Sequence, residues 1–163
     1  PLIQRALRRK RMCRLADYLQ AKTFLHRLQA ETRDEAIQEL VRAVCQSAGC
    51  GRKEIEERVL QRERAMSTGL GNGVAVPHAR IAGLKEPLVC VGLSSEGIDF
   101  NAPDGKPAQI ILLLLSSLED DCAQIELLAD ISRTFANRET RKLALQAEGF
   151  SEFMALIRSG KEF

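Results

Sequence analysis

Two apolar segments restrict the fold more than any other feature of the sequence. Leu88–Leu93 and Ala108–Leu115 are apolar at almost every position instead of at every second position. Both have the length of a strand, and a strand that is apolar on both faces is one that other elements cover on both faces. Neither segment is long enough to cross a membrane as a helix. They therefore predict central strands of a buried sheet.

Segments with the period of a helix precede and follow these strands. Thr32 and Glu35 form a capping-box pattern, in which each side chain can satisfy a free backbone N–H at the start of a helix. Helices are expected at residues 2–20, from the capping box to Gly49, at 53–65, from Asp120 onward, at 139–146 and at 151–157. Helices, then strands, then helices around a buried sheet predict an α/β fold.

Charge is distributed unevenly along the chain. Six of the 24 Lys and Arg residues lie in residues 1–14, which leaves 18 basic against 22 acidic residues in the remainder. We expect a basic arm or linker at 1–14 and one folded domain at 15–163. Aromatic residues are 4% of the chain, and the body is mildly acidic with no recognition motif, so no nucleic-acid partner is expected.

The five cysteines follow no disulfide or zinc-site spacing. Cys45 and Cys50, for example, are five positions apart, which fits neither a CxxC motif nor a zinc knuckle. No signal peptide is visible either. We therefore expect reduced thiols, no bound metal and a cytoplasmic location.

His78 stands in a context suited to phosphate. It follows Pro77 and a short strand, and a glycine-rich loop lies just upstream. Backbone N–H groups, hydroxyls and guanidinium groups stabilise phosphoryl oxygens, and a neutral imidazole is a competent nucleophile. The expected phosphate-binding residues are Arg62, Ser67, Thr68, Gly71, Asn72, Gly73 and Arg80. On spacing alone, a loop histidine beside two unrelated arginines stays an equal alternative, because the loop is not a Walker motif.

A longer pattern carries a family resemblance. Arg62-Glu63, followed by the segment Ser67–Arg80 (STGLGNGVAVPHAR), resembles the signature of the enzyme IIA domains of the fructose/mannitol class. These domains belong to the bacterial phosphoenolpyruvate-dependent sugar phosphotransferase system, and the class includes a nitrogen-regulatory branch. The resemblance extends over about residues 15–158, with further matches at 97–100, 104–105, 110–115 and 127–129.

The resemblance implies a fold and a chemistry. The fold would be a mixed β-sheet flanked by helices on both faces, an enzyme IIA mannitol/fructose-like sandwich. His78 would be the phosphoacceptor, charged by a histidine phosphocarrier protein, with Arg62, Ser67 and Thr68 around the phosphate. The domain would be a histidine phosphotransferase intermediate, if active, and would need no metal or other cofactor.

One residue departs from the family pattern. Many members have a second histidine close to the acceptor, and Gln124 stands at that position here. An amide can donate a hydrogen bond to the acceptor ring or to a phosphate oxygen, but it cannot titrate. Gln124 is therefore expected at the catalytic site, and it puts the onward transfer of phosphate in doubt more than its acceptance.

An alternative function follows from the start of the chain. Pro1-Leu2-Ile3 followed by six basic residues suits the cytoplasmic end of a membrane helix under the positive-inside rule. Pro1–Arg9 also resembles the last membrane helix of cation/proton antiporters. In this alternative the chain is a regulatory sensing domain at the cytoplasmic face of the inner membrane, attached to a transporter domain N-terminal to Pro1. A solvated charged segment without such a role is the simpler interpretation of the arm.

Overall fold

The computed structural model describes residues 12–159, so most of the predicted basic arm lies outside the described residues. Its centre is one mixed sheet of six strands, in the order β1-β5-β6-β3-β2, with β4 also pairing with β6. The strands are β1 (Phe24–Leu25), β2 (Gly69–Gly71), β3 (Val74–Ala75), β4 (His78–Ile81), β5 (Leu88–Ile98) and β6 (Ala108–Ser117). β5 runs antiparallel to β6, whereas β3 and β4 run parallel to it.

The two apolar segments form the middle of this sheet, as the sequence predicts. They correspond to β5 and β6, which pair with each other along most of their length. Successive residues of β6 enter opposite cores, because strand side chains alternate between the faces of a sheet. Ile110, Leu112 and Leu114 lie in one apolar cluster, and Ile111 and Leu113 lie in the other.

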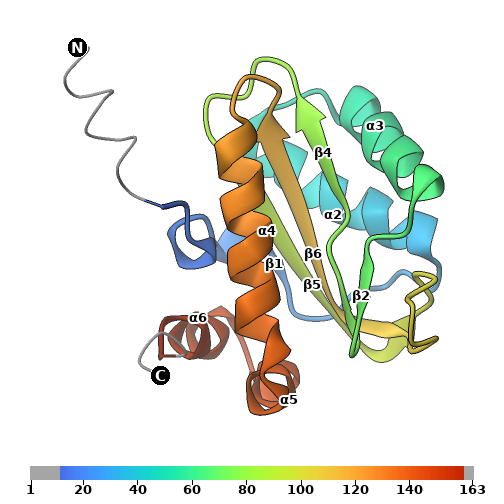
Figure 1. Cartoon of the computed structure of the whole chain (residues 1–163), viewed down its shortest axis with the longest axis vertical. Coiled ribbons are helices and arrows are strands. Elements are labelled where there is room, and N and C mark those ends of the chain that lie inside the picture. The colour runs from blue at the N-terminus through green and yellow to red at the C-terminus, as the bar shows by residue number, and fades with distance from the viewer. Residues whose placement is uncertain (1–11, 160–163) are drawn as a thin grey trace.

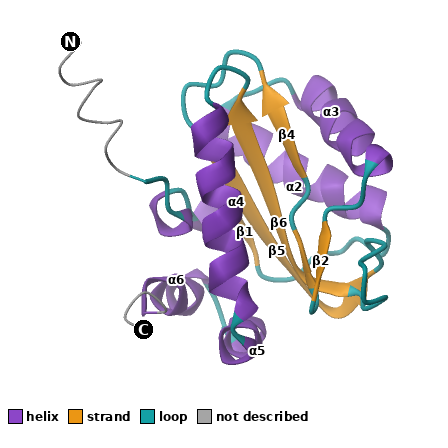
Figure 2. Ribbon diagram, in the orientation of Figure 1, coloured by secondary structure: helices purple, strands orange, loops and turns teal. Residues whose placement is uncertain are grey.

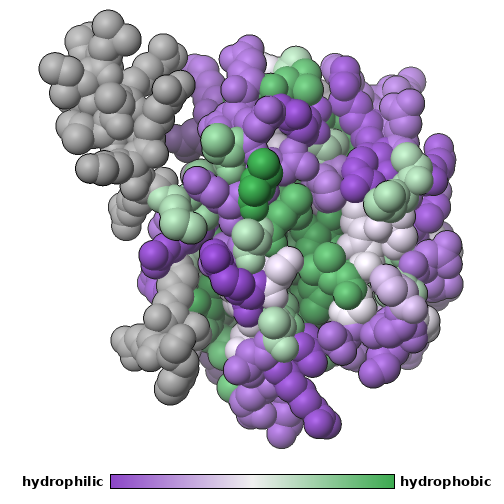
Figure 3. Space-filling model, in the orientation of Figure 1, coloured by the Kyte–Doolittle hydropathy of each residue, from purple (hydrophilic) through white to green (hydrophobic). Residues whose placement is uncertain are grey.

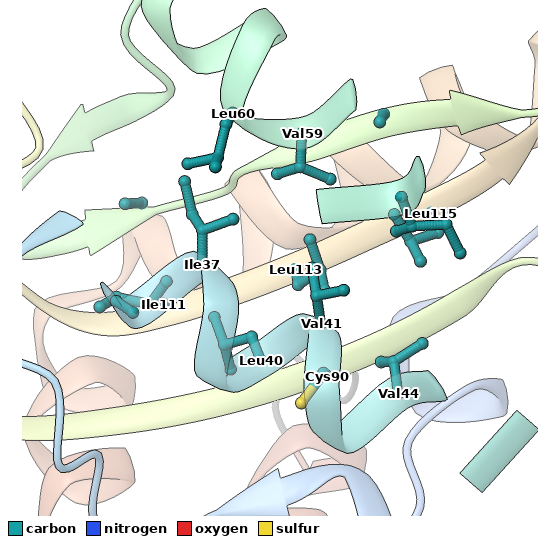
Figure 4. Close-up of a cluster of buried hydrophobic side chains, with 14 of the residues drawn as sticks. Ile37, Leu40, Val41, Val44, Val59, Leu60, Cys90, Ile111, Leu113 and Leu115 are labelled. Carbon is teal, nitrogen blue, oxygen red and sulfur yellow. The ribbon is translucent and has the colours of Figure 1, made fainter. Parts of the chain in front are cut away.

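Helices cover both faces of the sheet, which confirms the expected α/β sandwich (Figures 1 and 2). One face carries α2 (Arg33–Ala48) and α3 (Arg52–Ala65), and the other carries α4 (Asp121–Ala136), α5 (Arg138–Gln146) and α6 (Phe150–Ser159). In Figure 4 the apolar stripe of α2 faces Ile111, Leu113 and Leu115 of β6. None of the helices within residues 12–159 combines the length and the apolar character needed to cross a bilayer.

The capping box opens α2 as predicted. The backbone N–H of Glu35 donates to the Thr32 hydroxyl at 3.3 Å, and the Glu35 carboxylate accepts from the Thr32 N–H, also at 3.3 Å. Gly49 ends the helix in the left-handed conformation, with a φ of 70° that favours glycine. α3 begins after the next glycine, Gly51.

The prediction of a helix at residues 2–20 is wrong for the part of this segment that the structure describes. Residues 12–32 hold two single 3-10 turns, η1 (Leu15–Asp17) and η2 (Ala21–Thr23), and the short strand β1. The backbone N–H of Cys13 donates to Glu126 at 2.6 Å, and that of Leu15 donates to Asp130 at 2.7 Å. These bonds to carboxylates of α4 satisfy donors without a helix, so tertiary contacts override the local propensity.

Candidate functional site

His78 is the first residue of a strand, not the residue after one. Pro77 interrupts the edge of the sheet without ending it, so β3 and β4 lie one after the other beside β6. Proline lacks an N–H but keeps its carbonyl, and the Pro77 oxygen accepts from the N–H of Leu114 at 3.0 Å. His78 itself pairs with Leu114, which lies in the second half of β6.

The His78 side chain lies on the face of the sheet that α4 covers. Ala79 and Ile81 of β4 belong to the core beneath α2 and α3, so His78 and Arg80 take the other face. On β6, Ser116 pairs with Arg80 and shares that face. The first turns of α4 lie over this end of the sheet (Figure 1), where the Ser116 hydroxyl donates to Oε1 of Gln124 at 3.2 Å.

The ring of His78 is held in one tautomer by the backbone. Its Nδ1 lies 2.8 Å from the carbonyl oxygen of Val76. A carbonyl only accepts hydrogen bonds, so Nδ1 carries the proton and Nε2 keeps its lone pair. Burial lowers the pKa of the half-buried ring, and the charge of Arg62 lowers it further, against opposing effects of the Val76 carbonyl and of Glu63. The neutral, nucleophilic form of the ring is therefore favoured at neutral pH.

Glu63 anchors the segment that leads to His78, although it is not among the site residues expected from the sequence. Its side chain is buried, and it accepts from the N–H of Thr68 at 3.0 Å and from the Thr68 hydroxyl in a very short contact. The signal was available, because Ile55, Val59 and Glu63 follow one another at four-residue spacing on the buried side of α3. A carboxylate in such a stripe needs buried partners.

The hydroxyl groups of Ser67 and Thr68 are used in hydrogen bonds within the site loop and to its neighbours. The N–H of Val76 donates to the Thr68 carbonyl at 3.1 Å, which sets Thr68 beside the strand just before His78. The Ser67 hydroxyl donates to the carbonyl of Phe100 in a very short contact and accepts from the N–H of Gly69 at 3.1 Å. Both side chains hold the loop in place, and their role in binding phosphate stays a prediction.

The two predicted arginines approach the site from different elements. Arg62, in the last turn of α3, donates to the carbonyl of Met66 at 2.9 Å, and its charge acts on His78. Arg80 donates to the carbonyl of Leu118 at 2.7 Å and forms a close ion pair with Asp121 in the first turn of α4. The Nε of Arg80 is buried and has no hydrogen-bond partner within the described part of the chain.

Gln124 contacts Ser116, which pairs with Arg80 in the sheet, so the structure brings Gln124 to the face that carries His78. Because Oε1 accepts from Ser116, the amide turns its Nε2–H donors away from that serine. A donor here suits a phosphoryl oxygen, and it cannot act as an acid or a base.

The glycine turn is not beside His78. Gly71, Asn72 and Gly73 all have positive φ angles and form the tip of the β2–β3 hairpin. The carbonyl of Gly73 accepts from the first residues of β6, whereas His78 lies four residues further along that strand, about 13 Å away. The Asp104 carboxylate holds the turn by accepting from the N–H of Asn72 at 2.7 Å. The structure thus separates these three residues from the histidine with which the sequence analysis grouped them.

His26 is the other histidine of the chain. Its Nε2 lies 2.7 Å from the carbonyl oxygen of Ala147, and its ring centroid lies 6.3 Å from that of Phe24. Within residues 12–159, no group of three or more His, Cys, Asp or Glu side chains is arranged to hold a metal ion.

Comparison with known proteins gives a consistent result. Residues 17–160 match the family described as "Phosphoenolpyruvate-dependent sugar phosphotransferase system, EIIA 2". The fructose-specific EIIABC component of Bacillus subtilis is 29% identical over 146 residues, which are 88% of this chain and 23% of that protein. The fructose-specific EIIA component of Haloferax volcanii is 34% identical over 92 residues, which are 56% of this chain and 60% of that protein. The matches thus span less than two thirds of either relative.

Solved structures share the fold. The nitrogen regulatory protein IIA-Ntr of Neisseria meningitidis superposes with a TM-score of 0.82 at 25% identity, covering 88% of this chain and 98% of the other. The enzyme IIA of the Escherichia coli mannitol system, solved in complex with phosphorylated enzyme IIB, gives a TM-score of 0.73 at 18% identity. That match covers 86% of this chain and 97% of the other, and it concerns the fold alone.

Proposed function

Because the chain belongs to the EIIA 2 family of the phosphoenolpyruvate-dependent sugar phosphotransferase system, we propose that it is a phosphoryl carrier that accepts phosphate on Nε2 of His78. One observation carries the proposal, the hydrogen bond between Nδ1 of His78 and the carbonyl of Val76. It leaves the lone pair of Nε2 available in a ring that burial keeps neutral. The expected donor is a histidine phosphocarrier protein.

The transfer itself needs positioning more than acid–base chemistry. The Nε2 lone pair attacks the phosphorus, the bond between phosphorus and the donor imidazole breaks, and its electron pair returns to the donor ring. The Nδ1 proton of His78 stays on the ring, hydrogen-bonded to Val76. The resulting positive charge on the ring faces the negative charges of the phosphoryl group, so the product is partly neutralised internally.

Two arginines and one amide supply the remaining stabilisation in this proposal. The charge of Arg62 already acts on His78. Arg80 lies on the same sheet face as His78, and its buried Nε has no hydrogen-bond partner among residues 12–159. Cationic donors favour phosphoryl oxygens, and preorganised donors do so without a reorganisation cost. The Nε2–H group of Gln124 adds a neutral donor on the α4 side.

Apolar side chains at the rim support docking of a protein partner. Met66, Leu118 and Ile125 are exposed, and each adjoins a site residue: Arg62 bonds to Met66, Arg80 bonds to Leu118, and Ile125 follows Gln124. In Figure 3 apolar surface gathers beside α4, over the strands of the sheet. We expect the phosphocarrier protein to use this surface, and an enzyme IIB to follow it as acceptor. The Escherichia coli mannitol enzyme IIA was solved in complex with a phosphorylated enzyme IIB.

A second candidate function is the regulatory one, in a sugar-independent or transporter-linked setting in the cytoplasm. Two observations favour it. Gln124 stands in place of a titratable residue, and the N-terminal segment is bound to α4 through the N–H groups of Cys13 and Leu15. The helix α4 therefore contacts both the face that carries His78 and the N-terminal segment. A domain attached before Pro1 would sense the state of His78 through this helix.

A charging assay tests the carrier proposal. The chain is incubated with phosphoenolpyruvate and the general phosphotransferase proteins, and its mass is recorded. A gain of one acid-labile phosphate is expected, and it should vanish in His78→Ala but persist in His26→Ala. No gain under conditions that charge a control EIIA domain would refute the proposal. A second assay, of phosphate transfer from the charged chain to an enzyme IIB, separates the two candidate functions. The transport function predicts this transfer, whereas the regulatory function predicts stable charging without it.

A further inference from the structure

Cys45 and Cys50 face each other across the end of α2. Their sulfur atoms are 3.0 Å apart, about 1 Å further than the two sulfurs of a disulfide bond. Both thiols are reduced in this structure. Within residues 12–159, this is the one contact between two thiols. The five-position spacing of Cys45 and Cys50 would not have indicated it, because that spacing belongs to no known disulfide motif.

Local backbone structure brings the two thiols together. Cys45 lies in the last full turn of α2, and its carbonyl accepts from the N–H of Gly49 at 2.8 Å. The left-handed conformation of Gly49 then reverses the chain, so that Cys50 folds back against the helix that it has just left. The contact is therefore set by a defined helix-ending turn.

The two cysteines differ in access. Cys45 is buried in the core between α2, α3 and the sheet, whereas Cys50 is half-buried at the edge of the same core. An approaching reagent meets Cys50 first. Burial raises the pKa of Cys45 to about 12, with the Cys50 thiol as the next cause, so Cys45 is a poor first nucleophile.

We propose that Cys45 and Cys50 are a modification site at which low-molecular-weight disulfides, such as glutathione disulfide, close a reversible intramolecular disulfide. The site is separate from the phosphoryl chemistry of His78. It lies at the junction of α2 and α3, and α3 carries Arg62 and Glu63 at its other end.

The chemistry is two successive thiol–disulfide exchanges. First, the thiolate of Cys50 attacks one sulfur of glutathione disulfide, and one glutathione thiolate leaves. Next, the thiolate of Cys45 attacks the Cys50 sulfur of the mixed disulfide, and the second glutathione thiolate leaves. The two protons of the protein thiols end on the two glutathiones, and two electrons pass from the protein to the oxidant.

The test uses a convenient tryptic peptide. Cleavage after Arg42 and Arg52 leaves both cysteines in the peptide of residues 43–52, with no cleavage site between them. The whole chain is treated with glutathione disulfide, free thiols are blocked by alkylation, and the peptide is analysed by mass spectrometry. We expect a peptide two hydrogen atoms lighter than the reduced form, restored by dithiothreitol, and a melting temperature raised by about 5 °C.

Two variants show the order of events. In Cys45→Ser the mixed disulfide at Cys50 cannot be resolved, so glutathionylated peptide should accumulate at least tenfold above its level in the unsubstituted chain. In Cys50→Ser the buried Cys45 should stay unmodified. Circular dichroism of the reduced variants checks that they fold, and Cys45→Ala is the replacement if the serine variant does not.

Cys122 provides an internal reference in every sample. It is exposed, and no thiol contacts it within the described part of the chain, so it should stop at the glutathionylated stage. Glutathione on Cys122 together with an unreacted 43–52 peptide would overturn the proposal. Stable glutathione on Cys50 in the unsubstituted chain would overturn it as well.

Discussion

The Nδ1 atom of His78 lies 2.8 Å from the carbonyl oxygen of Val76, two residues earlier in the chain. Pro77 between them fixes the backbone, because its ring locks φ. The imidazole is thus oriented by its own strand and not by a separate carboxylate. This contact selects the nitrogen that remains available for phosphate.

The protonation of His78 should reflect its buried position. Burial and Arg62 lower its pKa, so the midpoint should lie below the ordinary value of 6.5. The contribution of the neutral ring to stability is then complete above pH 6.5 and is lost as the pH falls through the lowered pKa of the folded state. Imidazole NMR signals recorded against pH, assigned with His78→Ala, give the midpoint. A midpoint above 6.5 would contradict the electrostatic description of the site.

Arg62 should affect both the pKa and the transfer. Arg62→Ala removes a positive charge from the site, so the pKa of His78 should rise. The same substitution should slow charging by about 100-fold, because a donor for the phosphoryl oxygens is lost. Arg58→Ala, on an exposed part of the same helix, is the matched control and should change neither quantity. A slower transfer with an unchanged pKa would place Arg62 away from the ring.

Glu63 should be needed for the fold of the site loop. Glu63→Ala leaves the N–H and the hydroxyl of Thr68 without their buried acceptor, which should cost about 3 kcal/mol of unfolding free energy. Urea denaturation measures the loss. Glu57→Ala, exposed on the same helix, should change stability by less than about 0.5 kcal/mol. Equal effects of the two substitutions would show that Glu63 does not anchor the loop.

Gln124 should act as a donor held by Ser116. Gln124→Glu places a carboxylate near the phosphoryl group, and we expect charging to fall by about tenfold from the added repulsion. Ser116→Ala removes the hydrogen bond that orients the Gln124 amide, and it should lower the charging rate by a smaller factor, about threefold. Gln109→Glu, at the far end of β6, makes the same chemical change away from His78 and should leave the rate unaltered. A normal rate in Gln124→Glu would remove Gln124 from the site.

The central part of the fold could be predicted because its signals are local. The continuous apolar character of β5 and β6, and the reciprocal contacts of Thr32 and Glu35, are encoded within short segments. The structure near the start of the chain could not be predicted in this way. There the backbone N–H groups of Cys13 and Leu15 donate to carboxylates more than a hundred residues away in the sequence. A helical pattern in the sequence carries no information on such distant partners.

The site was predictable only in part, for the same reason. Sequence proximity grouped Gly71–Gly73 with His78, but the register of β3 and β4 on β6 separates them. Pro77 indicated the end of a strand, although its carbonyl lets the edge continue as β4. Glu63 was detectable from its place in the buried stripe of α3, whereas the contact of Ser116 with Gln124 depends on how α4 docks on the sheet.

Phosphate should be carried by one defined nitrogen of His78, and NMR can identify that nitrogen. The protein, labelled with ¹⁵N in its histidines, is charged with phosphoenolpyruvate and the general phosphotransferase proteins, and coupling between ³¹P and ¹⁵N is recorded. We expect coupling to Nε2 of His78, with Nδ1 still protonated and hydrogen-bonded to Val76. Coupling to Nδ1 of His78, or to either nitrogen of His26, would contradict it.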